Sequence, residues 1–291
     1  MTSSRFGIGC ILLATAMWGF SPLYYALMDH IPPLEIVTHR LIWSLPPLAL
    51  YALWTGRRAR FLAVARAPRE LGLLTLSAAM IAVNWFAFIY AIQIGQTGEA
   101  SFGYYAYPIA VMVLGVVVFR EGLTALQWLA AAIATGGVVW IGIGYGAPPW
   151  IALIVMTSFA AYGTIRKLAS TGPLVGVLWE LSLTVPLLLV WLLWIGGGAF
   201  LHSMSDALLL IGGSIFTGLP LVLFVEAAKR LRFSTVGVLF YVNPTLQFVS
   251  AVILGESFGA DRLIGFGIIW VAVLLYCAEL LRRDRAHGAG A

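Results

Sequence analysis

Charged side chains are rare within the apolar runs of this sequence, and three titratable residues there have the chemistry of a solute-binding site. His39 and Arg40 follow Pro33 by six and seven residues, which places them about 10 Å along a helix that begins at this proline. Glu180 follows Pro173 by seven residues in a matching run. A buried arginine or histidine can bind an anionic or polar solute, and a buried glutamate can carry a proton. A structural role, as an anchor on the inside of a helix bundle, explains these residues equally well.

Two prolines provide a second set of candidate residues. Pro108 and Pro244 each lie near the middle of an apolar run, and a proline both lacks an N–H and clashes with the carbonyl four residues earlier. Inside a membrane the freed carbonyl must find a partner or face a wet cavity. We therefore predict that both helices break and that a cavity forms there. The polar and aromatic neighbours expected to line it are Tyr104, Tyr107, Tyr241, Asn243 and Gln247. A kink repaired by adjacent helices is the alternative.

Asn84 and Trp85 complete the candidate site residues. Both lie in the middle of an apolar run, where Asn84 favours hydrogen bonding between helices slightly over contact with a substrate. The two cysteines, Cys10 and Cys277, also lie inside apolar runs. Their positions indicate helix packing, so the sequence predicts no disulfide framework, metal site or cofactor.

These candidate residues lie in a sequence that repeats itself. Residues 98–140 are matched by 234–276, with Pro108 on Pro244, and the match extends upstream so that Arg40 corresponds to Glu180. The other matched pairs are Tyr105 with Tyr241, Trp18-Gly19 with Tyr162-Gly163, Pro33 with Pro173, Pro46 with Pro186 and Ala91 with Ala227. The predicted units are residues 1–147 and 148–291, each of five helices. Because five is odd, the second unit enters the membrane inverted, an arrangement that permits alternating access. Arg40 and Glu180 then lie toward opposite membrane faces and can pair only if both side chains lean inward.

The composition indicates an all-α polytopic membrane protein. Of the 291 residues, 61% are hydrophobic and only 10% are charged, against about 25% charged in soluble domains, and the mean hydropathy is +0.96. Apolar runs long enough to cross a bilayer recur along the chain. We predict ten transmembrane helices, at roughly 6–28, 33–55, 71–93, 98–119, 124–144, 148–169, 173–196, 206–230, 234–254 and 260–281. The polar segment 56–70 is the only long connection expected. The first run is too long for a signal peptide, so we expect it to remain as a span.

The net charge of +5 does not indicate a nucleic-acid partner, because the basic residues lie at the ends of apolar runs. Fifteen of the 17 Arg and Lys residues, among them Arg166, Lys167 and Lys229, fall on one side of the predicted topology. Arg262 lies on the other side and Arg40 within a span. Such a distribution predicts that both termini are cytoplasmic.

Taken together, these motifs resemble a known family, the EamA branch of the drug/metabolite transporters, and within it the RarD subgroup. The matching segments are Trp18-Gly19-Phe20-Ser21-Pro22-Leu23-Tyr24, Glu35, His39-Arg40-Leu41-Ile42-Trp43-Ser44, Asn84-Trp85, Glu99-Ala100-Ser101-Phe102-Gly103-Tyr104, Tyr162-Gly163, Arg166-Lys167, Tyr241 and Pro244-Thr245-Leu246-Gln247-Phe248. Tyr107 precedes Pro108 where the family pattern has asparagine, whereas the second unit retains Asn243. The resemblance implies a bacterial inner-membrane permease.

Transport of a small organic metabolite or drug by alternating access is the function we expect, with the lipid bilayer and the solute as partners. The sequence contains no P-loop and no Gly-Lys pair, so coupling to protons or to solute exchange is more plausible than ATP hydrolysis. A polytopic membrane enzyme is one alternative, but no His-Glu-x-x-His or Gly-x-Ser-x-Gly motif occurs. A non-transporting subunit of a membrane complex is the other alternative. The sequence indicates no oligomeric state.

Overall fold

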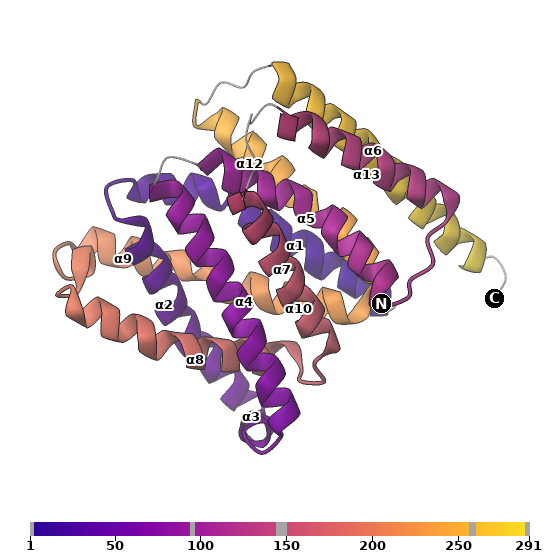
Figure 1. The fold of residues 1–291 in the computed structure, drawn as a ribbon. Coiled ribbons are helices and arrows are strands. Elements are labelled where there is room, and N and C mark those ends of the chain that lie inside the picture. Colours follow the sequence, from indigo (N-terminus) through magenta and orange to yellow (C-terminus); the bar gives the residue numbers. More distant parts are fainter. Residues whose placement is uncertain (1–2, 94–96, 144–149, 256–259, 289–291) are drawn as a thin grey trace.

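The computed structural model describes residues 3–93, 97–143, 150–255 and 260–288 (Figure 1). Regular structure in this part of the chain is helical, without a strand. The α-helices are α1 (Ser3–Tyr25), α2 (Pro33–Trp54), α3 (Arg58–Val64), α4 (Pro68–Gln93), α5 (Thr97–Val117), α6 (Ala125–Ile143), α7 (Trp150–Leu168), α8 (Pro173–Trp194), α9 (Met204–Gly212), α10 (Gly218–Arg230), α11 (Phe233–Phe240), α12 (Val242–Ile253) and α13 (Ala260–Gly288). Three 3-10 turns, η1 (Ala26–Met28), η2 (Gly198–Leu201) and η3 (Gly213–Phe216), lie between them.

Many of these helices have the length and apolar composition of membrane-spanning helices. In the described residues, six helical segments are long and apolar enough to cross it: Ser4–Met28, Pro68–Phe88, Ala125–Ile143, Trp150–Leu168, Pro173–Trp194 and Met204–Arg230. Two shorter apolar helices are Phe102–Val117 and Leu263–Glu279. The protein is therefore an all-helical, multi-pass membrane protein, while the count of ten spans stays a prediction.

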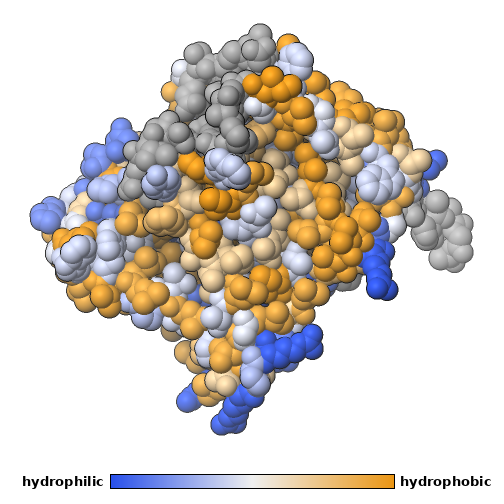
Figure 2. All heavy atoms as spheres, viewed as in Figure 1, coloured by the Kyte–Doolittle hydropathy of each residue, from blue (hydrophilic) through white to orange (hydrophobic). Residues whose placement is uncertain are grey.

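Large apolar side chains cover the outside of the molecule. Figure 2 shows hydrophobic residues over most of one face, with strongly hydrophilic ones gathered near α3 and toward the C-terminal end of α13. Trp54 and Trp194, at the C-terminal ends of α2 and α8, are 84% and 83% exposed. Exposed tryptophans at helix ends are typical of the membrane–water interface.

The most extensive helix pairs join the part of the chain before residue 144 to the part after residue 149. α1 packs against α10 and α12, and α7 packs against α4 and α5. α2 lies against α8, α5 against α11, and α6 against α13 (Figure 1). Glycine allows the close approach of α6 and α13, because a Cβ on Gly265 would lie 2.4 Å from Cγ1 of Ile141.

Of the two predicted helix breaks, only the second is present in the structure. α5 continues from Thr97 to Val117 through Pro108, so the break predicted in the first unit is wrong. A proline can stay within a helix because its fixed φ is helical, at the expense of one hydrogen bond. In the second unit α11 ends at Phe240 and α12 begins at Val242. The Tyr241 N–H there donates to the carbonyl of Val238 over 3.1 Å, a tightened turn three residues before Pro244.

Two further segments differ from the sequence-based expectation. The predicted helix 206–230 is divided by η3, and Thr217 at the junction has φ −121° and ψ −71°. The polar connection 56–70 contains the short helix α3. Both differences are local, but the first exposes backbone carbonyls that a nearby arginine uses.

Candidate functional site

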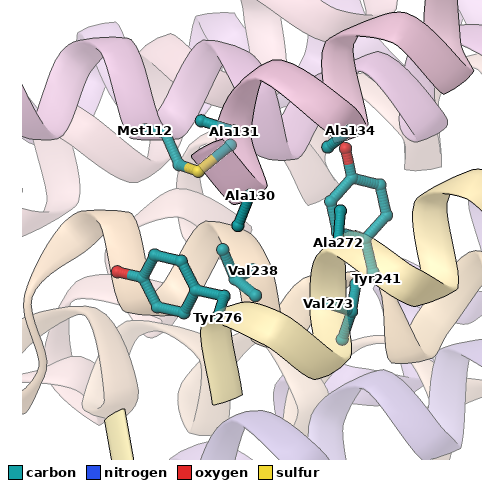
Figure 3. A pocket seen from close by; sticks show the side chains of 9 residues that line it. All are labelled: Met112, Ala130, Ala131, Ala134, Val238, Tyr241, Ala272, Val273 and Tyr276. Atoms are coloured by element: carbon teal, nitrogen blue, oxygen red, sulfur yellow. The ribbon is translucent and has the colours of Figure 1, made fainter. Parts of the chain in front are cut away.

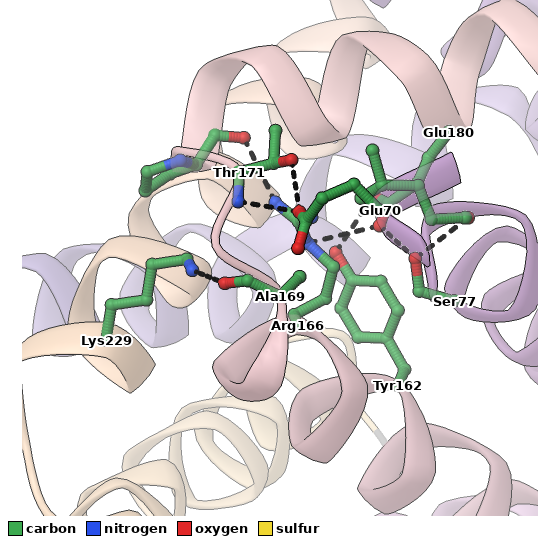
Figure 4. Close-up of polar contacts among 10 residues, drawn as sticks. Glu70, Ser77, Tyr162, Arg166, Ala169, Thr171, Glu180 and Lys229 are labelled. Atoms are coloured by element: carbon green, nitrogen blue, oxygen red, sulfur yellow. Dashed lines mark hydrogen bonds and ion pairs between the residues drawn. The ribbon is translucent and has the colours of Figure 1, made fainter. Parts of the chain in front are cut away.

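Glu180 of α8 is the most extensively bonded carboxylate inside the membrane region. It is 4% exposed, and α4 and α7 both supply its partners (Figure 4). The Ser77 hydroxyl donates to Oε1 over 2.6 Å, and the Tyr162 hydroxyl donates to Oε2 over 3.2 Å. Nε of Arg166 lies 3.1 Å from Oε1. The positive charge of the arginine and these hydroxyl donors offset the cost of burying the carboxylate.

Arg166 is a functional candidate that sequence reasoning missed. It lies in the last turn of α7, as the count of basic residues at helix ends predicts, but its side chain is fully buried, with Nη2 donating to the Pro173 carbonyl over 3.4 Å. Gly176 provides the space, because a Cβ there would lie 2.2 Å from both terminal guanidinium nitrogens. Residues four apart share a helix face, so Tyr162 with Arg166, and Gly176 with Glu180, could have indicated two facing surfaces.

A small cavity adjoins this ion pair. Trp85 and Glu180 line it together, and its other lining residues are Ile81, Val177, Leu181, Thr184 and Leu221, from α4, α8 and α10. The empty space measures ≈ 210 Å³ including its open side, but the interior has room for only about one water molecule, ≈ 10 Å³, far below the range of about 300–1,000 Å³ typical of ligand pockets. Two of the sequence-predicted site residues thus lie on one cavity. No group of three His, Cys, Asp or Glu side chains in the described ranges could hold a metal ion.

Asn84 and Tyr104 link three helices. The Tyr104 hydroxyl donates to Oδ1 of Asn84 over 2.8 Å. Nδ2 of Asn84 donates to the Val155 carbonyl over 2.8 Å and lies 3.3 Å from the Ser158 hydroxyl. Asn84 of α4 therefore hydrogen-bonds to both α5 and α7, the helix-to-helix role that the sequence favours for it.

We predict a coupling energy of about 1 kcal/mol between Asn84 and Tyr104, the upper part of the range measured for hydrogen bonds between transmembrane helices. The measurement is a double-mutant cycle on the free energy of unfolding, using Asn84→Ala, Tyr104→Phe and both together. Tyr90→Phe is the control, because Tyr90 lies on the exposed surface of α4. Strictly additive losses would contradict the prediction.

Arg40 does not pair with Glu180. Its Nε donates to the Thr217 hydroxyl over 2.8 Å, and Nη2 lies 3.5 Å from the Phe216 carbonyl, at the junction of η3 and α10. The guanidinium carbon lies 4.7 Å from the centre of the Tyr25 ring. Each of the two charges therefore has its own partners, with the half-buried Arg40 contacting an interrupted helix.

Tyr107 and Pro108 belong to packed regions of the core. Tyr107 is fully buried, with its ring centre 4.8 Å from that of Phe159 and 4.5 Å from that of Phe240. A Cβ on Gly237 would lie 2.9 Å from the Pro108 carbonyl oxygen. The first proline therefore marks the close crossing of α5 and α11, and a wet cavity around it stays a prediction.

In the described ranges, more buried polar atoms lack hydrogen-bond partners around Pro244 than around Pro108. The Tyr105 hydroxyl donates to the Pro244 carbonyl over 2.9 Å. The Tyr241 hydroxyl and Oδ1 of Asn243 are buried and have no hydrogen-bond partner among the described residues, and Gln247 is partly exposed one turn further. Tyr241 also lines a second small cavity, of ≈ 190 Å³, with Met112, Ala130, Ala131, Ala134, Val238, Ala272, Val273 and Tyr276 (Figure 3).

At the end of the molecule where most Arg and Lys residues lie, hydrogen bonds join the ends of neighbouring helices. Lys167 of α7 donates to the Ala228 carbonyl over 2.8 Å. Lys229 of α10 donates to the Ala169 carbonyl (Figure 4). The two helices thus cap each other's C-terminal carbonyls, a favourable place for cations. The carboxylate of Glu121 accepts from the N–H groups of Phe233 and Ser234 at the start of α11, and that of Glu70 from Ser170 and Thr171.

The same family description matches the chain twice. The EamA-like transporter family matches residues 5–143 and again 148–277. The chain belongs to the EamA-like transporter family. This EamA-like transporter is 35% identical over 293 residues to Protein RarD of Streptomyces exfoliatus, covering 99% of this chain and 92% of that protein. It is 32% identical over 301 residues to the chloramphenicol-sensitive protein RarD of Pseudomonas aeruginosa, with 99% and 100% covered.

A solved structure shows the same fold. A protein of known crystal structure superposes on this EamA-like transporter with a TM-score of 0.72 at 17% identity, covering 94% of this chain and 96% of that one. The similarity concerns the fold alone.

Proposed function

We propose that the chain is a secondary transporter, a non-enzymatic permease that moves a small organic metabolite or drug across the bacterial inner membrane by alternating access. Both termini would lie in the cytoplasm, where the positive-inside rule places the basic end. Membership of the EamA-like transporter family supports transport as the activity. The buried Arg166–Glu180 pair beside a cavity is the observation that carries the proposed site, because ionisable groups inside membranes mark solute and ion pathways.

Helix packing supports two inverted units, residues 1–147 and 148–291. In the ten-helix scheme α1 and α7 are the first helices of the two units. α1 packs against α10 and α12, which contribute to the third and fourth helices of the second unit, and α7 packs against their counterparts α4 and α5. Exchanging the units therefore preserves the contacts, as expected when each unit can take the other's role.

The size of the cavity indicates a closed conformation. Its interior of ≈ 10 Å³ is too small for an organic solute, so entry requires α4, α8 and α10 to separate. At the basic end, the contacts of Lys167 and Lys229 hold α7 and α10 together. Alternating access would break these contacts as the site opens toward the cytoplasm, driven by exchange or by protons.

Counterflow into proteoliposomes tests the proposal, with amino acids, organic acids and chloramphenicol as probes. We expect counterflow for one of these classes, and a loss on the order of tenfold or more with Glu180→Gln, because the amide cannot pair with Arg166 or carry a proton. Glu226→Gln is the matched control, since Glu226 pairs locally with Arg230 one turn away, and its flux should stay near that of the wild type.

The alternative functions predict other outcomes. A non-transporting subunit would show no flux for any class although the protein is folded. A membrane enzyme would convert a probe without moving it. Equal flux from Glu180→Gln and the wild type would retain the transporter and remove Glu180 from its site.

A further inference from the structure

A second group of buried polar residues lies near the N-terminal end of α2, beneath the turn η2. Glu35, Thr38 and His39 are 3%, 0% and 2% exposed. In the proposed orientation this is the outer end of the molecule, opposite the basic residues. The Arg166–Glu180 site does not include these side chains, so their burial needs its own explanation.

The tautomer of His39 follows from its neighbour. Nε1 of Trp43 donates to Nδ1 of His39 over 3.2 Å, and an indole nitrogen can only donate. Nδ1 is therefore unprotonated, the imidazole is neutral, and Nε2 carries the hydrogen. That Nε2–H is buried without a hydrogen-bond partner in the described part of the chain, an unfavourable state for a donor.

Glu35 is a buried carboxylate with little compensation. The carboxylate packs against Gly198 of η2, where a Cβ would lie 2.3 Å from Oε1. Its hydrogen bond from the Phe200 N–H is long, at 3.4 Å, and it forms no ion pair with a described basic side chain. Four residues separate Glu35 from His39, so both side chains lie on the same helix face. Neither side chain forms an ion pair with a described basic residue.

We propose that Glu35 and His39 form a proton-binding site at the outer end of the molecule. A proton from solvent bonds to Nδ1 of His39 as the hydrogen bond from Trp43 breaks, and the resulting imidazolium is stabilised by the Glu35 carboxylate. This site would bind the coupling proton of the transport proposed above. Only this coupling role rests on the proposed function; proton binding itself does not.

The turn η2 would respond to the bound proton. The ring of Phe200 stacks on His39 and Trp43, with centres 4.8 Å and 5.6 Å apart. Gly196, Gly197 and Gly198 all have positive φ, at 78°, 89° and 62°, a conformation that favours glycine. Because displacing Trp43 removes one side of this stack, protonation loosens the cover over the site.

Most other titratable groups on the surrounding elements contact partners other than Glu35 and His39. They are Tyr25 of α1 beside Arg40, Asp29 and His30 after η1, Arg40 of α2 on Thr217, Tyr90 of α4 at the surface, Glu180 of α8 with Arg166, His202 after η2 on the Gly198 carbonyl, and Asp206 of α9 with His30. Asp29, His30 and His202 are exposed, so water screens their charges.

Titration of the full-length protein in nanodiscs tests the site. The chain has 11 tryptophans, so fluorine NMR of 5-fluorotryptophan-labelled protein needs Trp43→Phe to assign the Trp43 resonance. Between about pH 4 and about pH 9, where histidines and buried carboxylates titrate, we expect this resonance to follow a one-proton curve. Glu35→Gln should weaken proton binding on the order of tenfold, which lowers the midpoint by about one pH unit.

Two further variants separate the site from the fold. His39→Gln should abolish the titration of Trp43, and His202→Gln should leave it unchanged. A Trp43 resonance independent of pH, as expected if a buried water merely satisfies Nε2, would overturn the proposal, as would an unchanged midpoint in Glu35→Gln. Because this measurement needs no solute, normal titration without counterflow would reject the transporter and retain the proton site, and the reverse result would reject the proton site alone.

Discussion

Replacing Arg166 with methionine is expected to lower the free energy of unfolding by about 3–5 kcal/mol, because removing one partner of a buried pair leaves an uncompensated charge. Arg166 is fully buried and lies 3.1 Å from the Glu180 carboxylate. In the variant, this carboxylate keeps only the hydroxyl donors of Ser77 and Tyr162. Reversible unfolding of the purified protein in mixed micelles measures the loss.

An exposed pair provides the control. Arg230 pairs with Glu226 one turn earlier on the same helix, and such surface pairs contribute about 1 kcal/mol or less, so Arg230→Met should have a small effect. Replacing Arg166 and Glu180 together with methionine should be less destabilising than Arg166→Met alone, because apolar residues can substitute for a complete pair. Equal losses from Arg166→Met and Arg230→Met would show that burial adds nothing to this pair.

Gly176→Ala is expected to destabilise the protein by about 2–4 kcal/mol, although alanine is the better helix former. The added Cβ would lie 2.2 Å from the terminal nitrogens of Arg166, which must then move away from Glu180. Losing the pair costs about 3–5 kcal/mol, and the gain in helix propensity returns only about 1 kcal/mol. The loss of the ion pair is therefore the larger effect, and thermal unfolding in detergent will detect it.

Gly136→Ala separates the gain in helix propensity from the loss of the ion pair. Gly136 lies inside α6, and a Cβ there would meet no atom within 4 Å, so alanine should be neutral or slightly stabilising. Gly176→Ala added to Arg166→Met should cause little further loss, because the clashing guanidinium is already absent. A large additional loss in that combination would mean that Gly176 has a different role.

The sequence predicted which polar residues lie inside the molecule better than it predicted which residues they contact. Glu180 and Asn84 are buried, as expected because a polar side chain in a long apolar run must face protein, while their part in solute binding stays a prediction. Arg166 lies at a helix end as predicted, but its burial was not predicted, since the count of basic residues along a topology ignores helix phase. Its inward direction depends on the space at Gly176, which becomes visible only when α7 and α8 are placed against each other.

The prolines illustrate a second limit of sequence reasoning. Pro108 and Pro244 occupy matching positions in the repeat, yet α5 passes through the first, and α11 ends at Phe240, four residues before the second. Local chemistry is the same at both positions, because each removes one N–H. The difference arises from tertiary contacts, such as the close approach of Gly237 to Pro108 and the Tyr105 hydrogen bond to Pro244.

The pairing of helices across the two parts of the chain has a consequence for biosynthesis. When the ribosome has delivered only the first part to the bilayer, α1, α2, α4 and α6 still lack the helices against which they pack most extensively. Arg40 then has neither Thr217 nor the Phe216 carbonyl, and Asn84 has no Val155 carbonyl. The nascent chain must therefore keep part of the hydrogen-bonding capacity of Arg40 and Asn84 unused in the membrane until α7 and α10 are inserted.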